Sequence, residues 1–180
     1  MVINQQLFNI IHYLTGKNRI LDVLGIFLAD YLGYFLVLIA LILLFSQKNI
    51  AERYRWFLFT AFSLVISRGL FTEIIRYFFP IQRPFVVYGF TPLVNHDVAA
   101  SFPSGHMALF FTLALCVFYL IGKKWGWRFI VAVLIMGLAR IFAGVHWPLD
   151  ILGGITISLM AFFITYFLFP KNKKINQPSA

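Results

Sequence analysis

The sequence predicts an all-α fold, a polytopic membrane bundle of five or six helices. Of its 180 residues, 61% are hydrophobic and only 12% are charged, whereas about a quarter of the residues in soluble domains are charged. The apolar residues form long runs, separated by short segments that hold most of the cations. A hydrocarbon core about 30 Å thick takes roughly 20 residues per helical span, so a chain of this length accommodates five or six spans. We therefore expect one integral membrane domain.

A short amphipathic helix is expected first, at residues 5–14. Its apolar side chains recur at helical spacing, which places them on one face. The segment is too short to cross a bilayer, so we expect it to lie in the membrane interface. No basic segment followed by a cleavage site precedes it, and the first spans are expected to direct insertion.

Five longer apolar runs follow and predict the membrane spans. Pro170 ends the last run, and the ten residues after it are polar and basic. Residues 1–170 are thus predicted to form a single membrane domain, and residues 171–180 a basic cytoplasmic tail. The predicted spans are Ile20–Phe45, Tyr54–Phe79, Met107–Ile121 with an upstream extension to about Pro103, Phe129–Val145 and Leu149–Phe169.

The distribution of cations predicts the orientation of the bundle. Most of them lie in the connections after the first and third spans and in the C-terminal tail, and the positive-inside rule places these segments in the cytoplasm. Lys17 and Arg19 would lie on the other side. The connections 80–103 and 144–148 then face the extracytoplasmic side, together with the N-terminus. The cytoplasmic cations are Lys48, Arg53, Arg55, Lys123, Lys124, Arg128, Lys171, Lys173 and Lys174.

The net charge of +9 does not indicate a nucleic-acid partner in this chain. Its cations lie between apolar runs, where they orient the spans and contact lipid headgroups. Cys116 is the only cysteine and lies inside an apolar run, so no internal disulfide can form. The membrane is the expected partner, and the sequence gives no indication of the oligomeric state.

Three polar stretches interrupt the apolar pattern on the side predicted to be extracytoplasmic. "RYFFPIQRPF" ends the second span, "SFPSGHM" opens the third, and "ARIFAGVHWPLD" connects the fourth to the fifth. Ionisable groups within spans are costly and face the bundle interior or a polar cavity. We therefore expect the three stretches to converge into an active site at the extracytoplasmic face. They contribute Arg76, Arg83, Ser104, His106, Arg140, His146 and Asp150.

The three arginines of this set need an anion, and phosphate matches their planar guanidinium groups. Ser104 and Gly105 follow Pro103 and are expected to begin a helix, whose first N–H groups lack partners within the helix and attract anions. Glycine also permits a ligand to approach the backbone closely. The predicted phosphate-binding residues are Arg76, Arg83, Ser104, Gly105 and Arg140.

Two histidines beside a phosphate site favour paired roles in phosphoryl transfer. His146 and Asp150 are four residues apart, so a helix that begins near Pro148 would bring the carboxylate to the imidazole. A carboxylate in this position fixes the tautomer and stabilises the charged ring. We predict that His146 is the nucleophile and that His106 protonates the departing oxygen.

The three stretches resemble the motifs of the type-2 phosphatidic acid phosphatase superfamily of membrane lipid phosphatases. Family sequences usually read K-x6-RP, PSGH and SR-x5-H-x3-D. This chain has PSGH at 103–106 and R-x5-H-x3-D from Arg140 to Asp150, but Arg76 replaces the usual lysine and Ala139 the usual serine. Arginine keeps the charge that binds phosphate, and the missing hydroxyl removes at most one hydrogen bond.

The resemblance implies hydrolysis of a phosphomonoester or pyrophosphate through a phosphohistidine on His146, with no metal ion or other cofactor. In this scheme His106 is the general acid, Asp150 positions His146, and the phosphate-binding residues hold the phosphoryl oxygens as charge builds. The implied substrate is a lipid phosphate, and the implied location is the bacterial cytoplasmic (inner) membrane.

The choice of lipid depends on a narrower resemblance. In its length, its N-terminal segment and the spacing from RPF to PSGH, the chain looks like bacterial undecaprenyl pyrophosphate phosphatases of this superfamily. Those enzymes recycle the polyprenyl carrier of cell-wall synthesis. Phosphatidylglycerophosphate, phosphatidic acid and the phosphates of lipid A are alternatives, because the phosphate-binding residues do not read the lipid tail.

The sequence leaves open two functions other than lipid phosphatase. An intramembrane serine protease would use Ser104 and His146, but it gives the arginines no role. An anion transporter would explain arginines within spans. It also predicts polar residues in the cytoplasmic half of the bundle, where the third and fourth spans are almost wholly apolar.

Three further ionisable residues lie within the predicted spans. We expect Arg68 to pair with Asp30 or Glu73 and tie two helices together, rather than to bind substrate. Glu73 is also placed to orient the arginine three residues after it. His12 and His96 are expected at the surface.

Overall fold

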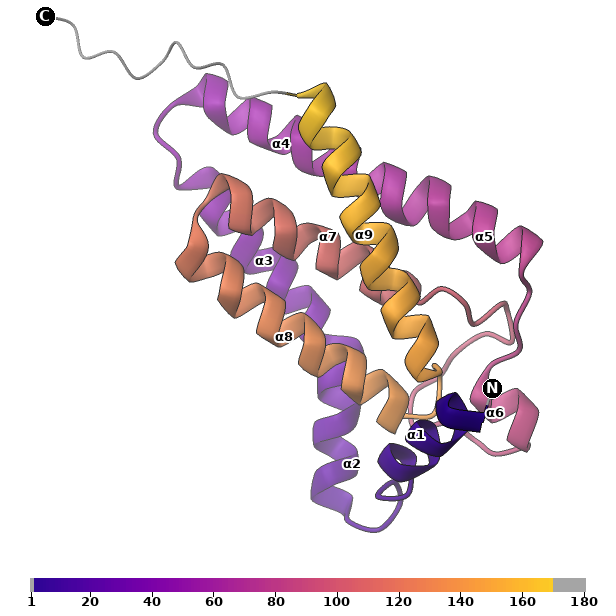
Figure 1. Ribbon diagram of the computed structural model, residues 1–180. Helices are drawn as coiled ribbons and strands as arrows, with labels where there is room; N and C mark the ends of the chain where they lie inside the picture. The colour runs from indigo at the N-terminus through magenta and orange to yellow at the C-terminus, as the bar shows by residue number, and fades with distance from the viewer. Residues whose placement is uncertain (1, 170–180) are drawn as a thin grey trace, which may run out of the picture.

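The computed structural model describes residues 2–169, and within this range it is helical, with no strand. The helices are α1 (Val2–His12), α2 (Arg19–Ile26), α3 (Leu32–Phe45), α4 (Ile50–Leu64), α5 (Thr72–Phe78), α6 (Pro84–Tyr88), α7 (Gly105–Leu120), α8 (Lys123–Phe142) and α9 (Pro148–Leu168) (Figure 1). Two π-helical segments join neighbouring helices: η1 (Phe27–Tyr31) joins α2 to α3, and η2 (Val65–Phe71) joins α4 to α5. The predicted tail 171–180 lies outside the described residues.

The prediction of an all-α membrane bundle is confirmed. Among residues 2–169, four continuous helices are long and apolar enough to cross a membrane: Arg19–Phe45, Ile50–Phe78, Lys123–Phe142 and Pro148–Leu168. The remaining predicted span is α7, whose 16 residues rise about 24 Å at 1.5 Å per residue. It is somewhat shorter than a hydrocarbon core of about 30 Å.

Two helices begin earlier than their apolar runs. α4 starts at Ile50 rather than Tyr54, because the Asn49 side chain caps it and accepts a hydrogen bond from Ala51 N at 2.9 Å. α8 starts at Lys123, six residues before the predicted Phe129. Most of the basic residues predicted in these connections therefore lie in the first two turns of α4 and α8, since a helix continues beyond the bilayer into its polar boundary.

α7 is the central helix and packs against both α8 and α9 (Figure 1). Ten of its 16 residues are buried, among them Met107 and Ala114. The close approach of α9 requires Gly154, because a Cβ there would lie 2.5 Å from Met107 Cβ and 2.8 Å from Ser104 O. This contact fixes the starts of α7 and α9 side by side.

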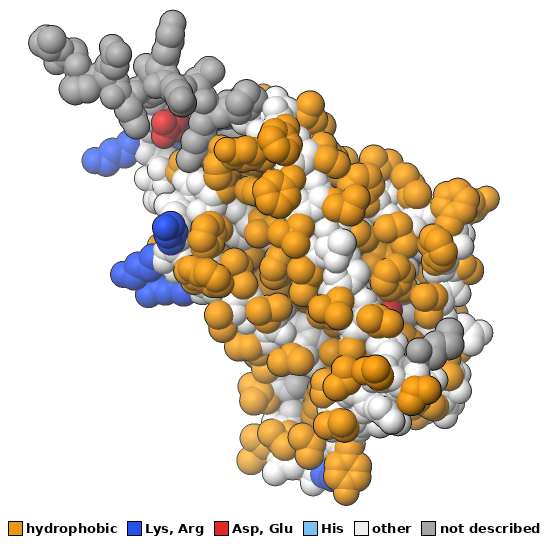
Figure 2. All heavy atoms as spheres, viewed as in Figure 1, with side chains coloured by type: hydrophobic (Ala, Val, Ile, Leu, Met, Phe, Trp, Pro, Cys, Tyr) orange, Lys and Arg blue, Asp and Glu red, His pale blue; other side chains and the backbone are white. Residues whose placement is uncertain are grey.

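The outer surface is apolar, as expected of helices that face lipid. Figure 2 shows hydrophobic side chains over most of the visible face. Lys and Arg side chains gather at the end where the α3–α4 and α7–α8 connections lie (Figures 1 and 2). A band of apolar surface bounded by cations is typical of a protein that crosses a membrane.

α1 spans residues 2–12 rather than 5–14, and it packs on the bundle as well as presenting an apolar outer face. Phe8 is fully buried, with its ring 5.0 Å from that of Trp147 and 5.9 Å from that of Tyr88. The expectation that His12 lies at the surface is wrong: it is half-buried, and its Nδ1 contacts Phe142 O at 2.9 Å. α1 therefore covers the ends of α8 and α9.

Candidate active site

The three polar stretches meet at one end of the bundle. The segment between α5 and α7, the start of α7, and the turn between α8 and α9 are joined by hydrogen bonds. Ser104 N donates to Asp150 O at 3.0 Å, which ties the start of α7 to the first turn of α9. The prediction that these stretches converge is confirmed by this geometry.

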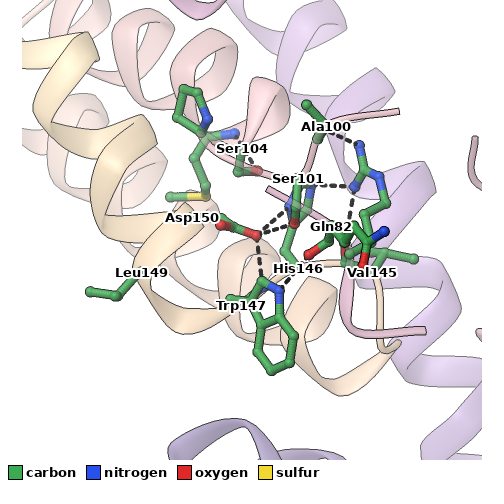
Figure 3. A network of polar contacts seen from close by, with 12 residues as sticks. Gln82, Ala100, Ser101, Ser104, Val145, His146, Trp147, Leu149 and Asp150 are labelled. Carbon is green, nitrogen blue, oxygen red and sulfur yellow. Dashed lines mark hydrogen bonds and ion pairs between the residues drawn. The ribbon is translucent and has the colours of Figure 1, made fainter. Parts of the chain in front are cut away.

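His146 and Asp150 form a buried pair. His146 lies in the turn before α9, and α9 begins at Pro148, as the sequence predicts. His146 Nδ1 lies 3.1 Å from Asp150 Oδ2, and both side chains are almost fully buried (Figure 3). A carboxylate partner fixes the proton on Nδ1, which leaves Nε2 unprotonated. The pair thus presents a nucleophilic nitrogen.

Asp150 is held by two further donors that sequence reasoning missed. Ser101 Oγ donates to Asp150 Oδ2, and Trp147 N donates to the same oxygen at 2.8 Å (Figure 3). Trp147 Nε1 in turn donates to Gln82 O at 2.9 Å. These contacts fix the carboxylate in one orientation. Ser101 lies three residues before the PSGH serine, a position that no motif marks.

Arg83 binds the loop carbonyls around His146. Its guanidinium donates to Ala99 O at 3.0 Å, Ala100 O at 3.3 Å and Val145 O at 2.9 Å. Nη1 also lies 3.3 Å from His146 Nε2, the ring nitrogen that does not contact Asp150. Arg83 therefore both fixes the loops and places positive charge beside His146 Nε2.

Arg140 combines an ion pair with unused donors. Its Nη1 lies 3.1 Å from Ala29 O and 3.3 Å from Asp30 Oδ1, which belongs to η1. Within residues 2–169, Nε and Nη2 of Arg140 are buried without a hydrogen-bond partner. Buried donors of this kind are costly unless a ligand satisfies them. Arg140 is therefore suited to hold an anion.

Arg76 lies over the start of α7. Its Nη2 donates to Pro103 O at 3.1 Å, and Nη1 lies 3.7 Å from Glu73. A Cβ on Gly105 would lie 3.2 Å from Arg76 Nη2, so the glycine permits this close approach. Ser104 is fully buried and caps α7, with its Oγ accepting from Met107 N at 3.4 Å. A buried cap of this kind does not fit the nucleophile of a serine protease.

A cavity of about 380 Å³ opens in front of His146. This volume is within the range of pockets that hold small ligands. Arg76 and Gly105 line the cavity. Arg83 is not part of the lining but contacts His146, and Arg140 is close enough to His146 to lower its pKa. Its polar lining is made by Asp30, Tyr34, Arg68, Arg76, His96, His106 and His146.

His96 corrects an expectation drawn from the sequence. The sequence predicts a surface position, yet His96 is half-buried, lines the cavity, and places its ring 5.9 Å from that of His146. It lies in the loop after α6, where no motif or periodicity marks it. A histidine in an irregular segment gives no indication of its burial, so only the fold could place it.

Burial and neighbouring arginines govern protonation in the loops. Burial lowers the pKa of His146 well below its usual 6.5, and the positive charges of Arg140 and Arg83 lower this pKa further. The pKa of His96 falls to about 4 for the same reasons. Burial and the nearby Arg76 lower the pKa of Arg83 to about 10, which leaves it cationic at neutral pH. The nucleophile candidate is thus neutral and the site is positively charged.

The donor set is suited to an anion rather than a metal ion. Among residues 2–169, no group of three or more His, Cys, Asp or Glu side chains has the arrangement of a metal site. The described side chains that line the cavity include Arg68 and Arg76, whose guanidinium groups repel a cation and bind phosphate oxygens.

Comparison with known proteins identifies relatives along most of the chain. The model of the PAP2 superfamily matches residues 56–174. The chain is 30% identical over 165 residues to the undecaprenyl-diphosphatase BcrC of Bacillus subtilis (strain 168), with 91% of this chain and 82% of that protein covered. It is also 34% identical over 103 residues to phosphatidylglycerophosphatase B of the same organism, covering 49% of this chain and 48% of that protein.

The fold is similar to a solved structure as well. The crystal structure of Aquifex aeolicus LpxE superposes with a TM-score of 0.74 at 25% sequence identity, and the match covers 92% of this chain and 95% of that one. The matched family region includes α5 to α9 and the loops between them, which hold all of the site residues that the sequence predicts.

Proposed function

This chain belongs to the PAP2 superfamily, and we propose that it releases the terminal phosphate of undecaprenyl pyrophosphate through a phosphohistidine intermediate. It is a multi-pass membrane lipid phosphatase. The observation that carries the proposal is the buried His146–Asp150 pair beside a cavity lined by arginines.

The first step is attack of His146 Nε2 on the terminal phosphorus. The N–P bond forms as the P–O bond to the leaving group breaks, and Asp150 stabilises the positive charge that develops on the imidazole. Arg83 Nη1 contacts Nε2 before substrate arrives, so it is placed to move onto a phosphoryl oxygen. The free donors of Arg140 hold another oxygen.

His106 completes the proton transfers. It lies on the first turn of α7 and lines the same cavity as His146. As general acid it donates a proton to the departing oxygen. In the second step it accepts a proton from the water that attacks the phosphohistidine, which releases phosphate and restores His146. This cycle requires no metal ion.

A lipid substrate is supported by an apolar cavity next to the polar one. This second cavity, of about 190 Å³, lies between α3, α4 and α7, and Val37 lines both cavities. Its other walls include Leu41, Phe57 and Leu113. An acyl or polyprenyl chain fits such walls, whereas an anion path through the bundle would need polar ones.

Undecaprenyl pyrophosphate is favoured because a relative that aligns with most of this chain is named for it. Phosphatidylglycerophosphate, phosphatidic acid and lipid A phosphates are alternatives within the same chemistry. We also propose that the site faces the extracytoplasmic side of the cytoplasmic membrane. The site lies at the end of the bundle opposite the basic starts of α4 and α8, which the positive-inside rule assigns to the cytoplasm.

Phosphate release by the detergent-purified protein tests the proposal. Undecaprenyl pyrophosphate, phosphatidylglycerophosphate and phosphatidic acid are compared with EDTA present, and His146→Ala is the control. Preference for the pyrophosphate, lost in His146→Ala, is the expected result. Activity on glycerolipids alone would keep the chemistry and replace the substrate, and no activity on any of them would refute the proposal.

A further inference from the structure

Arg68 stands in the candidate site although no motif includes it. It belongs to η2, the π-helical segment that joins α4 to α5. Single π-helical turns are rare and occur frequently at functional sites, because they redirect side chains out of the regular helical order. The other such segment, η1, contributes Asp30 to the same cavity. Both segments thus direct a charged side chain toward the place where substrate binds.

The position of Arg68 is on the His106 side of the cavity. A Cβ on Gly105 would lie 2.8 Å from Arg68 Nε and 3.2 Å from Arg76 Nη2, so the two guanidiniums cover the start of α7 together. His106 follows directly on α7. Arg68 is therefore adjacent to the group that is proposed to serve the leaving oxygen.

A single carboxylate bridges both guanidiniums. Glu73 forms an ion pair with Arg68, and its Oε1 also lies 3.7 Å from Arg76 Nη1. The Glu73 side chain is 53% exposed and that of Arg68 is 39% exposed, so the pair is not enclosed between packed helices, and Arg68 lines the cavity. Arg68 thus pairs with Glu73, one of its two expected partners. The expectation that this pair ties two helices together is wrong, because both residues lie in the continuous helix Ile50–Phe78. A pair within one helix leaves the guanidinium accessible to a ligand.

We infer that Arg68 binds the proximal phosphate of a lipid diphosphate, the phosphate that remains on the lipid after the terminal one is transferred. This inference rests on the proposed function. In the proposed function Arg76, Arg83 and Arg140 serve the phosphoryl group under attack, and Arg68, which lines the cavity, supplies the added positive charge that a diphosphate requires and a monophosphate does not.

The leaving group differs between a diphosphate and a monophosphate substrate, so a role of Arg68 at the proximal phosphate has a measurable consequence. When His146 attacks a diphosphate, the P–O–P bridge breaks and the electron pair goes to the bridging oxygen of a lipid monophosphate, a weakly basic group that a cation stabilises. When His146 attacks a monophosphate, the departing group is a strongly basic alkoxide, which needs the proton of His106. Loss of Arg68 should therefore slow hydrolysis of the diphosphate more than that of the monophosphate. Loss of His106 should slow hydrolysis of the monophosphate more than that of the diphosphate.

Matched substrates test this directly. Farnesyl diphosphate and farnesyl phosphate carry the same tail, and kcat/KM for each is measured with the wild type, Arg68→Gln and Arg55→Gln. Arg55→Gln is the matched control, since it removes a guanidinium from the far end of the same continuous helix. Arg68→Gln is expected to lower kcat/KM about 10- to 100-fold for the diphosphate, the range for losing one charged hydrogen-bonding partner, and less than about threefold for the monophosphate.

Inhibition gives a second readout that does not depend on monophosphate turnover. Pyrophosphate spans both phosphate positions and orthophosphate occupies only the terminal one, so Arg68→Gln should raise the inhibition constant of pyrophosphate about tenfold or more and leave that of orthophosphate unchanged. Arg68→Lys, which keeps the charge, should show intermediate losses and serves if the Gln variant does not fold. Glu73→Gln breaks the ion pair yet frees Arg68, and should keep the preference for diphosphate.

The outcomes separate the inference from the proposed function. If the wild type hydrolyses neither lipid phosphate, the proposed function fails. Two results would overturn the inference while the wild type is active. Either Arg68→Gln lowers kcat/KM equally for both substrates, or Glu73→Gln loses as much kcat/KM for the diphosphate as Arg68→Gln does. In both cases Arg68 serves only the ion pair.

Discussion

Replacement of Asp150 by asparagine tests the role of the buried carboxylate most sharply. The asparagine keeps the shape of the side chain and an oxygen that can accept from Ser101 and Trp147. It removes the negative charge beside His146, which is neutral at rest and becomes positive when Nε2 is phosphorylated. The variant therefore loses an interaction that is strong only once the reaction proceeds, and kcat should fall.

The magnitude follows from the distance between the two groups. Opposite unit charges 3.1 Å apart attract by about 5 kcal/mol at an effective dielectric constant of about 20. Each tenfold change in rate corresponds to about 1.36 kcal/mol. Because the imidazole carries less than a full charge in the transition state, we expect kcat to fall about 10³-fold to 10⁴-fold.

Single-turnover release of phosphate from the favoured lipid substrate measures this effect. Asp22→Asn is the control, because Asp22 accepts from Gly16 N at the exposed start of α2, away from the site. Thermal unfolding in detergent confirms that each variant is folded. A folded Asp150→Asn protein with kcat within about tenfold of the wild type would refute the charge argument.

The remaining predictions concern the groups around this pair. Ser101→Ala removes the hydrogen bond to the charged Asp150 carboxylate, so kcat should fall about 10- to 100-fold. Ser63→Ala is the control: it loses a hydrogen bond to Phe59 O and should lower only the stability. Gly105→Ala places a Cβ 2.8 Å from Arg68 Nε, which displaces the guanidinium, so kcat/KM should fall about tenfold or more. Gly69→Ala is the control, because its Cβ meets nothing closer than 3.9 Å, and its kcat/KM should match that of the wild type. The lowered pKa of His96, about 4 against 6.5, means that the unfolded state binds more protons below pH 6.5. The thermal midpoint of the wild type should therefore fall as the pH drops from 6.5 toward 4, and that of His96→Gln should fall less. An equal fall in the wild type and in His96→Gln would contradict the lowered pKa of His96.

The fold followed from the sequence because hydropathy dominates in a membrane protein. A span must satisfy its backbone hydrogen bonds internally, so an apolar run of about 20 residues leaves little choice but a helix. Bounds were less predictable. Asn49 and Gly122 set the starts of α4 and α8 through local geometry, and polar residues such as Lys123 belong to helices that extend past the apolar run.

The candidate site was predictable where charge and spacing coincide. The i,i+4 relation of His146 and Asp150 requires only that α9 begin near Pro148, and Pro at the first helical position is a strong signal for that start. Ser101, His96 and Arg68 carried no such signal. Their roles depend on loop conformation and on a π-helical turn, which periodicity of 3.6 residues does not reveal.

The most direct test of the account is to trap the phosphorylated enzyme. The protein is mixed with lipid diphosphate labelled in the terminal phosphate, with EDTA present, and quenched in alkali, under which phosphohistidine persists. We expect protein-bound label in the wild type, its loss on acid treatment, and its absence from a folded His146→Ala variant. Label that persists in His146→Ala, or turnover by that variant at the wild-type rate, would contradict the assignment of His146 as the nucleophile.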